Sequence, residues 1–316
     1  LKHRYPAPAH ARRGASMAGA GGTALAVLAV VRLSGLGGHA HLLRQAPAAS
    51  DHAAQPSSLS AELRQLSQRE RLARVTPIAR VHVPKCGSSF MASLFRLPGI
   101  CRERPGTPES QDEIKNDRCP GVFWRGEHAG FGDQYEAMKG HAMVMLRQPE
   151  QRLLSGYYNL GVRGWQPHGW CRRRPPPDAL SYALAAQGVG VKLLTRAGGE
   201  ALPCGRRPPA PEETALALRR LREGFAFVGL AERWELSICL LHAMFGGACH
   251  ESEMRLVHAG PKHGSGVYDT KELRGFRDVH DGALYEEATR IFEENLQLYN
   301  VSQTTCAPCF ESAGLV

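Results

Sequence analysis

The clearest indication of the fold is the segment Ile78-Ala-Arg-Val-His-Val-Pro-Lys-Cys-Gly-Ser-Ser-Phe90. Its first six residues are rich in apolar side chains, which predicts a buried strand over 78–83. Residues 84–89 combine proline, glycine and serine, which predicts a turn that leads into a helix. Glycine lets successive N–H groups point inward, Lys85 adds a positive charge, and the serine hydroxyls donate further hydrogen bonds. The stretch is therefore typical of an anion-binding loop.

This loop differs from the loop G-x-x-x-x-G-K-[ST] that binds nucleoside triphosphates. Lys85 precedes Gly87, the first glycine of that pattern is absent, and no Ser or Thr follows the lysine directly to bind Mg²⁺. The pattern suits a phosphate that is bound without Mg²⁺. Taken alone, it is equally compatible with a tight turn whose lysine has no binding role.

A second stretch, Met145-Leu-Arg-Gln-Pro-Glu-Gln-Arg-Leu-Leu-Ser-Gly-Tyr-Tyr-Asn159, follows the same plan. A strand predicted over 141–146 ends at Arg147, and a proline stands at the first position of the helix that follows. Arg147 and Ser155 can reach one oxyanion near the carboxyl edge of the sheet, where open α/β sheets bind ligands. Arginine grips a phosphate with two parallel hydrogen bonds. For Arg152, on the same helix, we favour an ion pair on the helix surface.

The rest of the chain alternates helical and strand patterns. A third buried strand is predicted over 225–230, and helices are predicted over 89–95, 150–159, 178–186, 211–223, 232–245 and 281–299. Strands separated by helices predict an α/β fold: a single P-loop-like domain with a central parallel sheet flanked by helices. The predicted parts are a basic tail (1–17), a signal-anchor (18–38), a stem or linker (39–75), the α/β domain (76–302) and a C-terminal tail (303–316).

The net charge of +9 is concentrated in the N-terminal part of the chain. Residues 1–75 carry 10 Lys and Arg but 3 Asp and Glu, whereas basic and acidic residues nearly balance in the remainder. A nucleic-acid partner is therefore not expected, although the overall pI would suit one. A hydrophobic fraction of 43% excludes a wholly disordered or collagen-like chain.

An apolar run over 18–31 continues beyond Arg32 to residue 38, and positive residues precede it. If the whole of 18–38 spans a membrane, these flanking charges keep the N-terminus cytoplasmic. The chain is then a type II single-pass protein, anchored in the membrane through this segment with its body in the lumen. A cleaved signal peptide of a secreted protein, a plastid or other organellar transit peptide, and a disordered tail are the alternatives.

Together, these motifs resemble those of carbohydrate sulfotransferases that use 3′-phosphoadenylyl sulfate (PAPS), in particular the Golgi heparan and chondroitin type. Residues 82–90 are similar to the family's first loop, and residues 146–158 are similar to its second motif at nearly every position. Residues 227–241 look like a third motif, F-V-G-L-x-E-x-x-x-x-S-x-x-L-L. The resemblance covers about residues 78–300, and the three motifs stand in the family's order and spacing.

The resemblance implies a donor site. The residues that would bind the 5′-phosphosulfate of PAPS are Lys85, Cys86, Gly87, Ser88, Ser89 and Phe90, and those for the 3′-phosphate are Arg147 and Ser155. Lys85 would also act in catalysis, next to the oxygen that leaves, and no metal is expected. Cys86 and Ser88 replace the family's commoner Thr and Gly, and Gln148 replaces its usual acid. These differences leave the acceptor open.

The segment Trp124-Arg-Gly-Glu-His-Ala-Gly-Phe-Gly132 resembles the family's G-H-x-x-[FY] stretch, whose His is a proposed base. We therefore expect His128 to accept the proton of the acceptor hydroxyl, because an imidazole titrates near neutral pH. Glu127 is the alternative, since related enzymes use Glu. One extra residue between Gly126 and His128 makes the alignment less certain.

The resemblance implies a glycan or polysaccharide acceptor and a Golgi location. The three arginines at 172–174, close in sequence to Trp165 and Trp170, are candidates to grip an acidic sugar. Two other functions stay open: a P-loop-like nucleoside or sugar kinase, and a non-catalytic glycan-binding relative. The sequence does not indicate the oligomeric state.

Nine cysteines are present, and Cys86 in the loop is expected to be free. The other eight suit disulfides in a lumenal compartment, with about 100 possible arrangements. Proximity in sequence suggests the pairs 101–119, 171–204, 239–249 and 306–309. Asn300-Val-Ser302 is an N-glycosylation sequon, which also fits a lumenal protein.

Overall fold

A parallel sheet forms the centre of the computed structural model, which describes residues 58–103, 118–123, 128–161, 177–201, 207–254 and 267–315. Its strand order is β2-β1-β4-β6. The four strands are β1 (Ile78–Val81), β2 (Val122–Phe123), β4 (Ala142–Leu146) and β6 (Phe225–Leu230). Every residue of β4 and β6 is buried. Helices cover both faces of the sheet, and strands in that position are continuous apolar runs instead of alternating ones.

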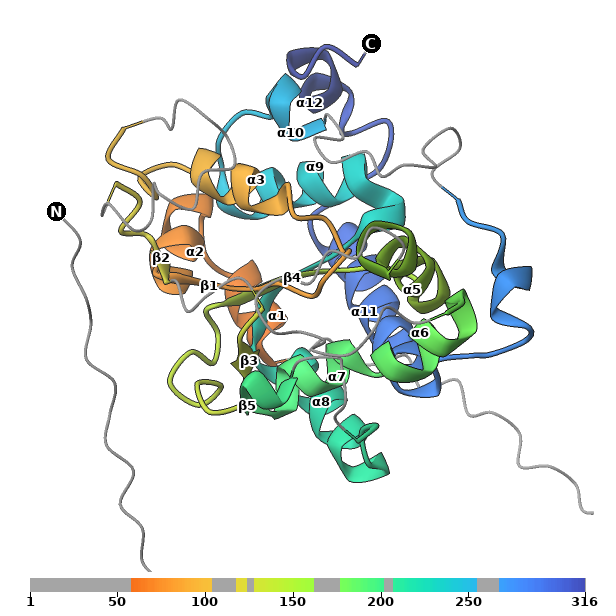
Figure 1. The fold of residues 1–316 in the computed structure, drawn as a ribbon. Coiled ribbons are helices and arrows are strands. Elements are labelled where there is room, and N and C mark those ends of the chain that lie inside the picture. Colours follow the sequence, from red (N-terminus) through yellow and green to blue (C-terminus); the bar gives the residue numbers. More distant parts are fainter. Residues whose placement is uncertain are drawn as a thin grey trace, which may run out of the picture. The chain divides into compact units, whose positions relative to one another are not determined.

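Helices flank the sheet as expected for an α/β fold (Figure 1). On one side lie α3 (Phe90–Arg96), α9 (Trp234–Phe245) and α10 (Glu251–Met254), and on the other α7 (Val189–Thr195), α8 (Pro211–Gly224) and α11 (Val279–Leu298). The helix α5 (Pro149–Gly156), its π-helical continuation (Tyr157–Gly161) and α6 (Ala179–Ala186) pack together. A two-residue strand β3 (Gly130–Phe131) pairs antiparallel with β5 (Ala197–Gly198). The predicted α/β class is confirmed.

The region predicted to be a stem or linker is helical in its described part, as the pattern over 59–72 indicates. Residues 58–75 form α1 (Ser58–Arg64) and α2 (Gln68–Val75), and Leu63 and Val75 are completely or almost completely buried. Arg71 donates a hydrogen bond to the carbonyl oxygen of Met244 at 2.5 Å. These helices therefore belong to the same compact unit as the sheet.

The C-terminal segment predicted as a tail also packs on the core. It contains α12 (Ala307–Ser312), in which Phe310 is buried, and two disulfides join it to the region of α9 and α10. These bonds are Cys239–Cys306 and Cys249–Cys309. The predicted pairs 239–249 and 306–309 were wrong, because α12 lies beside α9 and offers each cysteine a partner from a distant part of the chain.

The other cysteine predictions have mixed outcomes. The Cys101–Cys119 bond is confirmed, and Cys86 is a free, buried cysteine. Cys171 and Cys204 lie outside the described residues. Disulfides are typical of proteins that fold in an oxidising compartment.

The predicted location, a single-pass Golgi membrane protein, needs correction. Among the residues that the structure describes, no helix combines the length and apolarity that crossing a membrane requires. The segment predicted as the anchor, 18–38, lies outside those residues.

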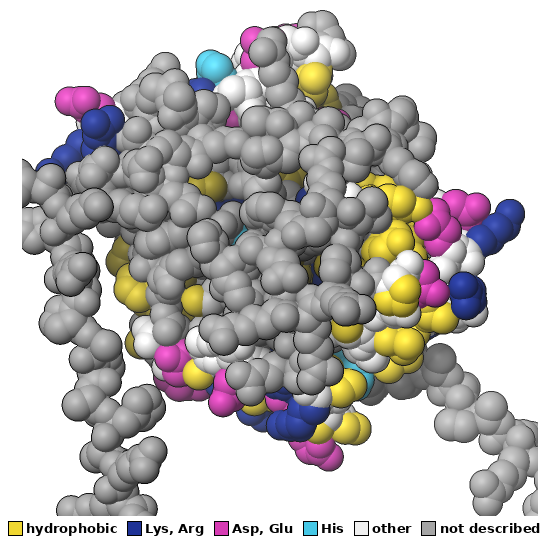
Figure 2. Space-filling view, in the orientation of Figure 1, with side chains coloured by type: hydrophobic (Ala, Val, Ile, Leu, Met, Phe, Trp, Pro, Cys, Tyr) yellow, Lys and Arg dark blue, Asp and Glu magenta, His cyan; other side chains and the backbone are white. Residues whose placement is uncertain are grey.

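The visible surface carries charges of both signs. Figure 2 shows Lys and Arg side chains next to Asp and Glu side chains at the right and lower edges of this face. Some of the opposite charges form exposed ion pairs, such as Arg274 with Asp178 at 3.4 Å. Such pairs contribute little to stability, so the fold depends mainly on its buried groups.

Candidate functional site

The loop between β1 and α3 has a backbone shaped by two left-handed residues. Lys85 has φ of +67° and Gly87 has φ of +87°. Arg80 donates to the carbonyl oxygen of Ser88 at 3.0 Å, and Arg147 donates to that of Lys85 at 3.4 Å. Within the described residues, no hydrogen bond uses the N–H groups of Gly87, Ser88 or Ser89. Backbone N–H groups in such turns form concave sites that attract anions.

Two cations meet at this loop, at the carboxyl ends of neighbouring parallel strands. Burial and the nearby charge of Arg147 lower the pKa of Lys85. Glu232 partly balances Arg147, with 3.8 Å between its Oε1 and the Nε of Arg147. The same carboxylate accepts the N–H of Gln148 and the hydroxyl of Tyr285, both at 3.0 Å. The positive groups are therefore kept together by the fold, which favours an anionic ligand.

His128 lies near Lys85 and Arg80. Its ring stacks on that of His82, with 4.4 Å between the ring centres. Burial, and then the charges of Arg80 and Lys85, lower the pKa of His128 to about 3. The imidazole is therefore neutral at physiological pH, but a pKa this low makes it a weaker base than the near-neutral imidazole that the sequence analysis expected. The alternative base, Glu127, lies outside the described residues.

Four predicted donor-site residues are buried: Cys86, Ser89, Phe90 and Ser155. Cys86 is 1% exposed, and burial raises the pKa of its thiol to about 12. Phe90 is also 1% exposed and stacks on Phe227. These two side chains attach the loop to the core. Their backbone N–H groups donate to the carbonyl oxygens of Val83 and Gly87, which helps to shape the turn. Ser155 lies on α5 with 2% exposure, and its assignment to the 3′-phosphate stays a prediction.

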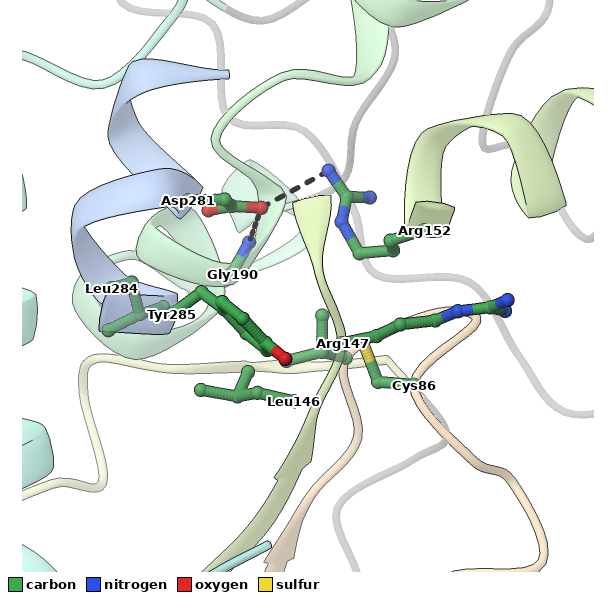
Figure 3. Close-up of a pocket in the computed structure, with 9 residues that line it drawn as sticks. Cys86, Leu146, Arg147, Arg152, Gly190, Asp281, Leu284 and Tyr285 are labelled. Atoms are coloured by element: carbon green, nitrogen blue, oxygen red, sulfur yellow. Dashed lines mark hydrogen bonds and ion pairs between the residues drawn. The ribbon is translucent and has the colours of Figure 1, made fainter. Parts of the chain in front are cut away.

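A cavity of about 10 Å³ lies behind the loop, on the order of the space for one water molecule (Figure 3). The residues that line it are Val83, Cys86, Leu146, Arg147, Arg152, Gly190, Asp281, Leu284 and Tyr285. In Figure 3, the guanidinium group of Arg147 points away from Asp281, whereas that of Arg152 approaches it. The two arginines of the second motif therefore have different surroundings.

The sequence analysis favoured an ion pair on the helix surface for Arg152, and this expectation was wrong because the side chain is buried. It is 4% exposed, and its Nη2 lies 3.1 Å from Asp281 and 3.4 Å from Asp278. Asp281 also accepts the N–H groups of Gly190 and Val191, both at 3.0 Å. This network joins α5 to α7 and α11, so Arg152 supports the site from within the core.

Sequence reasoning missed several residues around the loop. Arg80 donates to a loop carbonyl, and Glu232 pairs with Arg147. Glu232 occupies the Glu position of the third motif, F-V-G-L-x-E. The guanidinium of Arg147 also lies 5.9 Å from the centre of the Tyr268 ring. Gln151 bonds to both the N–H and the carbonyl of Tyr268, which fixes it against α5. Only Glu232 had a sequence signal, because the other contacts join segments whose pairing no local pattern indicates.

Comparison with known proteins adds no assignment. No family model matches the chain, and no curated protein or solved structure shows a significant match. In the ranges that the structure describes, no group of three or more His, Cys, Asp or Glu side chains could hold a metal ion. The three arginines at 172–174, with Trp165 and Trp170, lie outside those ranges.

Proposed function

We propose that this protein is a sulfotransferase of the PAPS-dependent carbohydrate type, which transfers a sulfuryl group to a hydroxyl of a glycan or polysaccharide. The observation that carries the proposal is the meeting of Lys85 and Arg147 at a loop with left-handed residues at 85 and 87. Cations and unengaged N–H groups in one place suit the phosphosulfate and the 3′-phosphate of the donor. The three sequence motifs favour a sulfuryl donor over other phosphate compounds.

The donor supplies a sulfuryl group that is activated by its bond to the 5′-phosphate. Transfer breaks the bond between sulfur and the phosphate oxygen and forms one between sulfur and the acceptor oxygen. Negative charge grows on the phosphate oxygen that leaves. The ammonium group of Lys85 stabilises that charge, and this interaction is stronger in the transition state than in the ground state.

His128 takes the proton that the acceptor hydroxyl loses. Its ring is neutral over the whole physiological range, because its folded pKa of about 3 lies far below that pH. The neighbouring cations that lower this pKa also attract the anionic donor. The ring is therefore unprotonated before the donor and the acceptor bind.

The low pKa of His128 gives a test by NMR. The imidazole signals of His128, assigned with the variant His128→Asn, are expected to stay constant between about pH 5 and pH 8. In the variant Arg80→Gln, one of the charges that lowers the pKa is lost, so protonation should begin at a higher pH than in the unsubstituted protein. A titration of His128 near its ordinary pKa in the unsubstituted protein would contradict this assignment.

The proposed donor site is tested by calorimetric titration of the full chain with the PAPS product 3′-phosphoadenosine 5′-phosphate (PAP). AMP, which lacks the 3′-phosphate, and ATP with Mg²⁺ serve as comparators. We expect PAP to bind. Arg147→Ala should lower the affinity for PAP by about 10- to 100-fold, because a hydrogen bond to the charged 3′-phosphate is lost. The affinity for AMP, which lacks that phosphate, should fall less. Arg69→Ala, which removes an exposed arginine of α2, is the matched control and should change nothing.

Two results would overturn the proposal. One is the absence of PAP binding. The other is a preference for ATP with Mg²⁺, which would favour the kinase alternative.

A further inference from the structure

We propose that Trp234, which none of the sequence motifs assigns to donor binding, is a positioning residue for the loop. This inference rests on the proposed function in that the loop is taken to bind the donor. A Cβ atom added to Gly87 would lie 2.5 Å from Cζ3 and 3.2 Å from Cη2 of Trp234. The six-membered ring of the indole therefore packs directly on the backbone of Gly87.

Gly87 suits this contact in two ways. Its φ of +87° is one that glycine adopts without strain. The absence of a Cβ leaves space for the indole, which any other residue would push away. The backbone at position 87 and the ring of Trp234 therefore determine each other's position.

The indole is itself held in place. Its Nε1–H donates to the carbonyl oxygen of Glu253 at 2.7 Å. Glu253 is completely buried, and its carboxylate accepts the N–H of His250 at 2.8 Å and lies 3.0 Å from Nε2 of His242. The disulfide Cys249–Cys309 fastens the chain just before this point. Trp234 is thus a fixed support and not a mobile side chain.

Three contacts therefore hold the loop, at consecutive parts of its backbone. Arg147 holds the carbonyl of Lys85, Trp234 packs on Gly87, and Arg80 holds the carbonyl of Ser88. The contact with Trp234 falls between the other two. Without it, the N–H groups of the loop lose the fixed arrangement that an anion requires, and the core-facing side of the loop becomes accessible.

Cys86 reports on this arrangement without any ligand. It is free, 1% exposed and adjacent to Gly87. A thiol reagent such as 5,5′-dithiobis(2-nitrobenzoate) is applied to the full chain with its disulfides intact, and Cys86→Ser identifies the signal of this thiol. We expect Trp234→Ala to raise the rate of Cys86 modification by about tenfold, because local opening exposes the thiol. Trp234→Phe, which keeps an aromatic ring, should give a smaller rise.

Leu240→Ala is the matched control, because Leu240 lies in the same helix α9 and is completely buried. It should lower the melting temperature without changing the rate of Cys86 modification. PAP titration adds a second readout, in which Trp234→Ala lowers the affinity for PAP by about tenfold. Gly87→Ala should lower the affinity for PAP less in a chain that already carries Trp234→Ala than in the unsubstituted chain, because the clash with the indole is gone.

The outcomes separate this inference from the proposed function. Equal modification rates of Cys86 in the unsubstituted chain and in Trp234→Ala and Trp234→Phe would overturn the positioning role, whether or not PAP binds. A raised rate in a chain that does not bind PAP would support the role of Trp234 and overturn the donor site instead. Additive effects of Gly87→Ala and Trp234→Ala on PAP binding would also count against the direct contact.

Discussion

Lys85→Ala lowers the kcat of sulfuryl transfer by about 10²- to 10³-fold, while the affinity for PAP falls much less. The difference arises because Lys85 stabilises charge that develops on the departing phosphate oxygen, and PAP lacks the reacting bond. Its ammonium lies at the carboxyl end of β1, in a partly buried position where the pKa is lowered. The measurement uses radiolabelled PAPS with unsulfated chondroitin and heparosan polymers as acceptors.

Two variants control for this effect. Lys85→Arg keeps the positive charge and should recover part of the activity. Lys139→Ala removes an exposed lysine that pairs with Glu223 at 3.2 Å, and should leave kcat unchanged. A fall in kcat of less than about threefold for Lys85→Ala would show that Lys85 does not stabilise the transition state.

Arg152→Ala destabilises the folded protein by about 3–5 kcal/mol, because it leaves buried carboxylates without their cation. Asp278 and Asp281 are 1% and 5% exposed, and both lie within ion-pair distance of Arg152. Burial and the neighbouring Asp278 already raise the pKa of Asp281, despite the opposing effect of Arg152. For a domain of this size, the melting temperature should fall by about 10 °C in a calorimetric scan.

The pH dependence distinguishes this mechanism from a simple loss of packing. A carboxyl whose pKa in the folded state lies above its unfolded value gains stability from protonation as the pH falls. Removal of Arg152 increases that difference, so the destabilisation should be smaller at about pH 5 than at about pH 7.5. Arg74→Ala breaks an exposed pair with Glu62 and should cost at most about 1 kcal/mol. Equal losses for the two arginines would contradict the role of the buried network.

The local patterns determined the central strands and the turns that follow them. Strands over 78–83, 141–146 and 225–230 were predicted, and the structure has them at 78–81, 142–146 and 225–230. Buried parallel strands are continuous apolar runs bounded by turn residues, so a single sequence contains their signal. The two-residue strands β2, β3 and β5 were not predicted, because so few residues show no periodicity.

The candidate site was predictable in its two cations and less so in its surroundings. Lys85 and Arg147 each follow a predicted strand, and the carboxyl ends of parallel strands lie at one edge of the sheet. His128 lies near Lys85, and its role as a base stays a prediction. The partners Arg80, Trp234 and Tyr268 depend on the packing of segments that are far apart in sequence.

The α/β class and the two cations at the ends of neighbouring strands follow from residue type, hydrophobic period and turn chemistry, all of which a single sequence contains. Three features are visible only in the folded chain: the disulfide partners of Cys239 and Cys249, the burial of Arg152, and the contact between Trp234 and Gly87. Each of these depends on which surfaces meet after the helices pack. The free energy of that packing is spread over many side chains, and no local pattern records it.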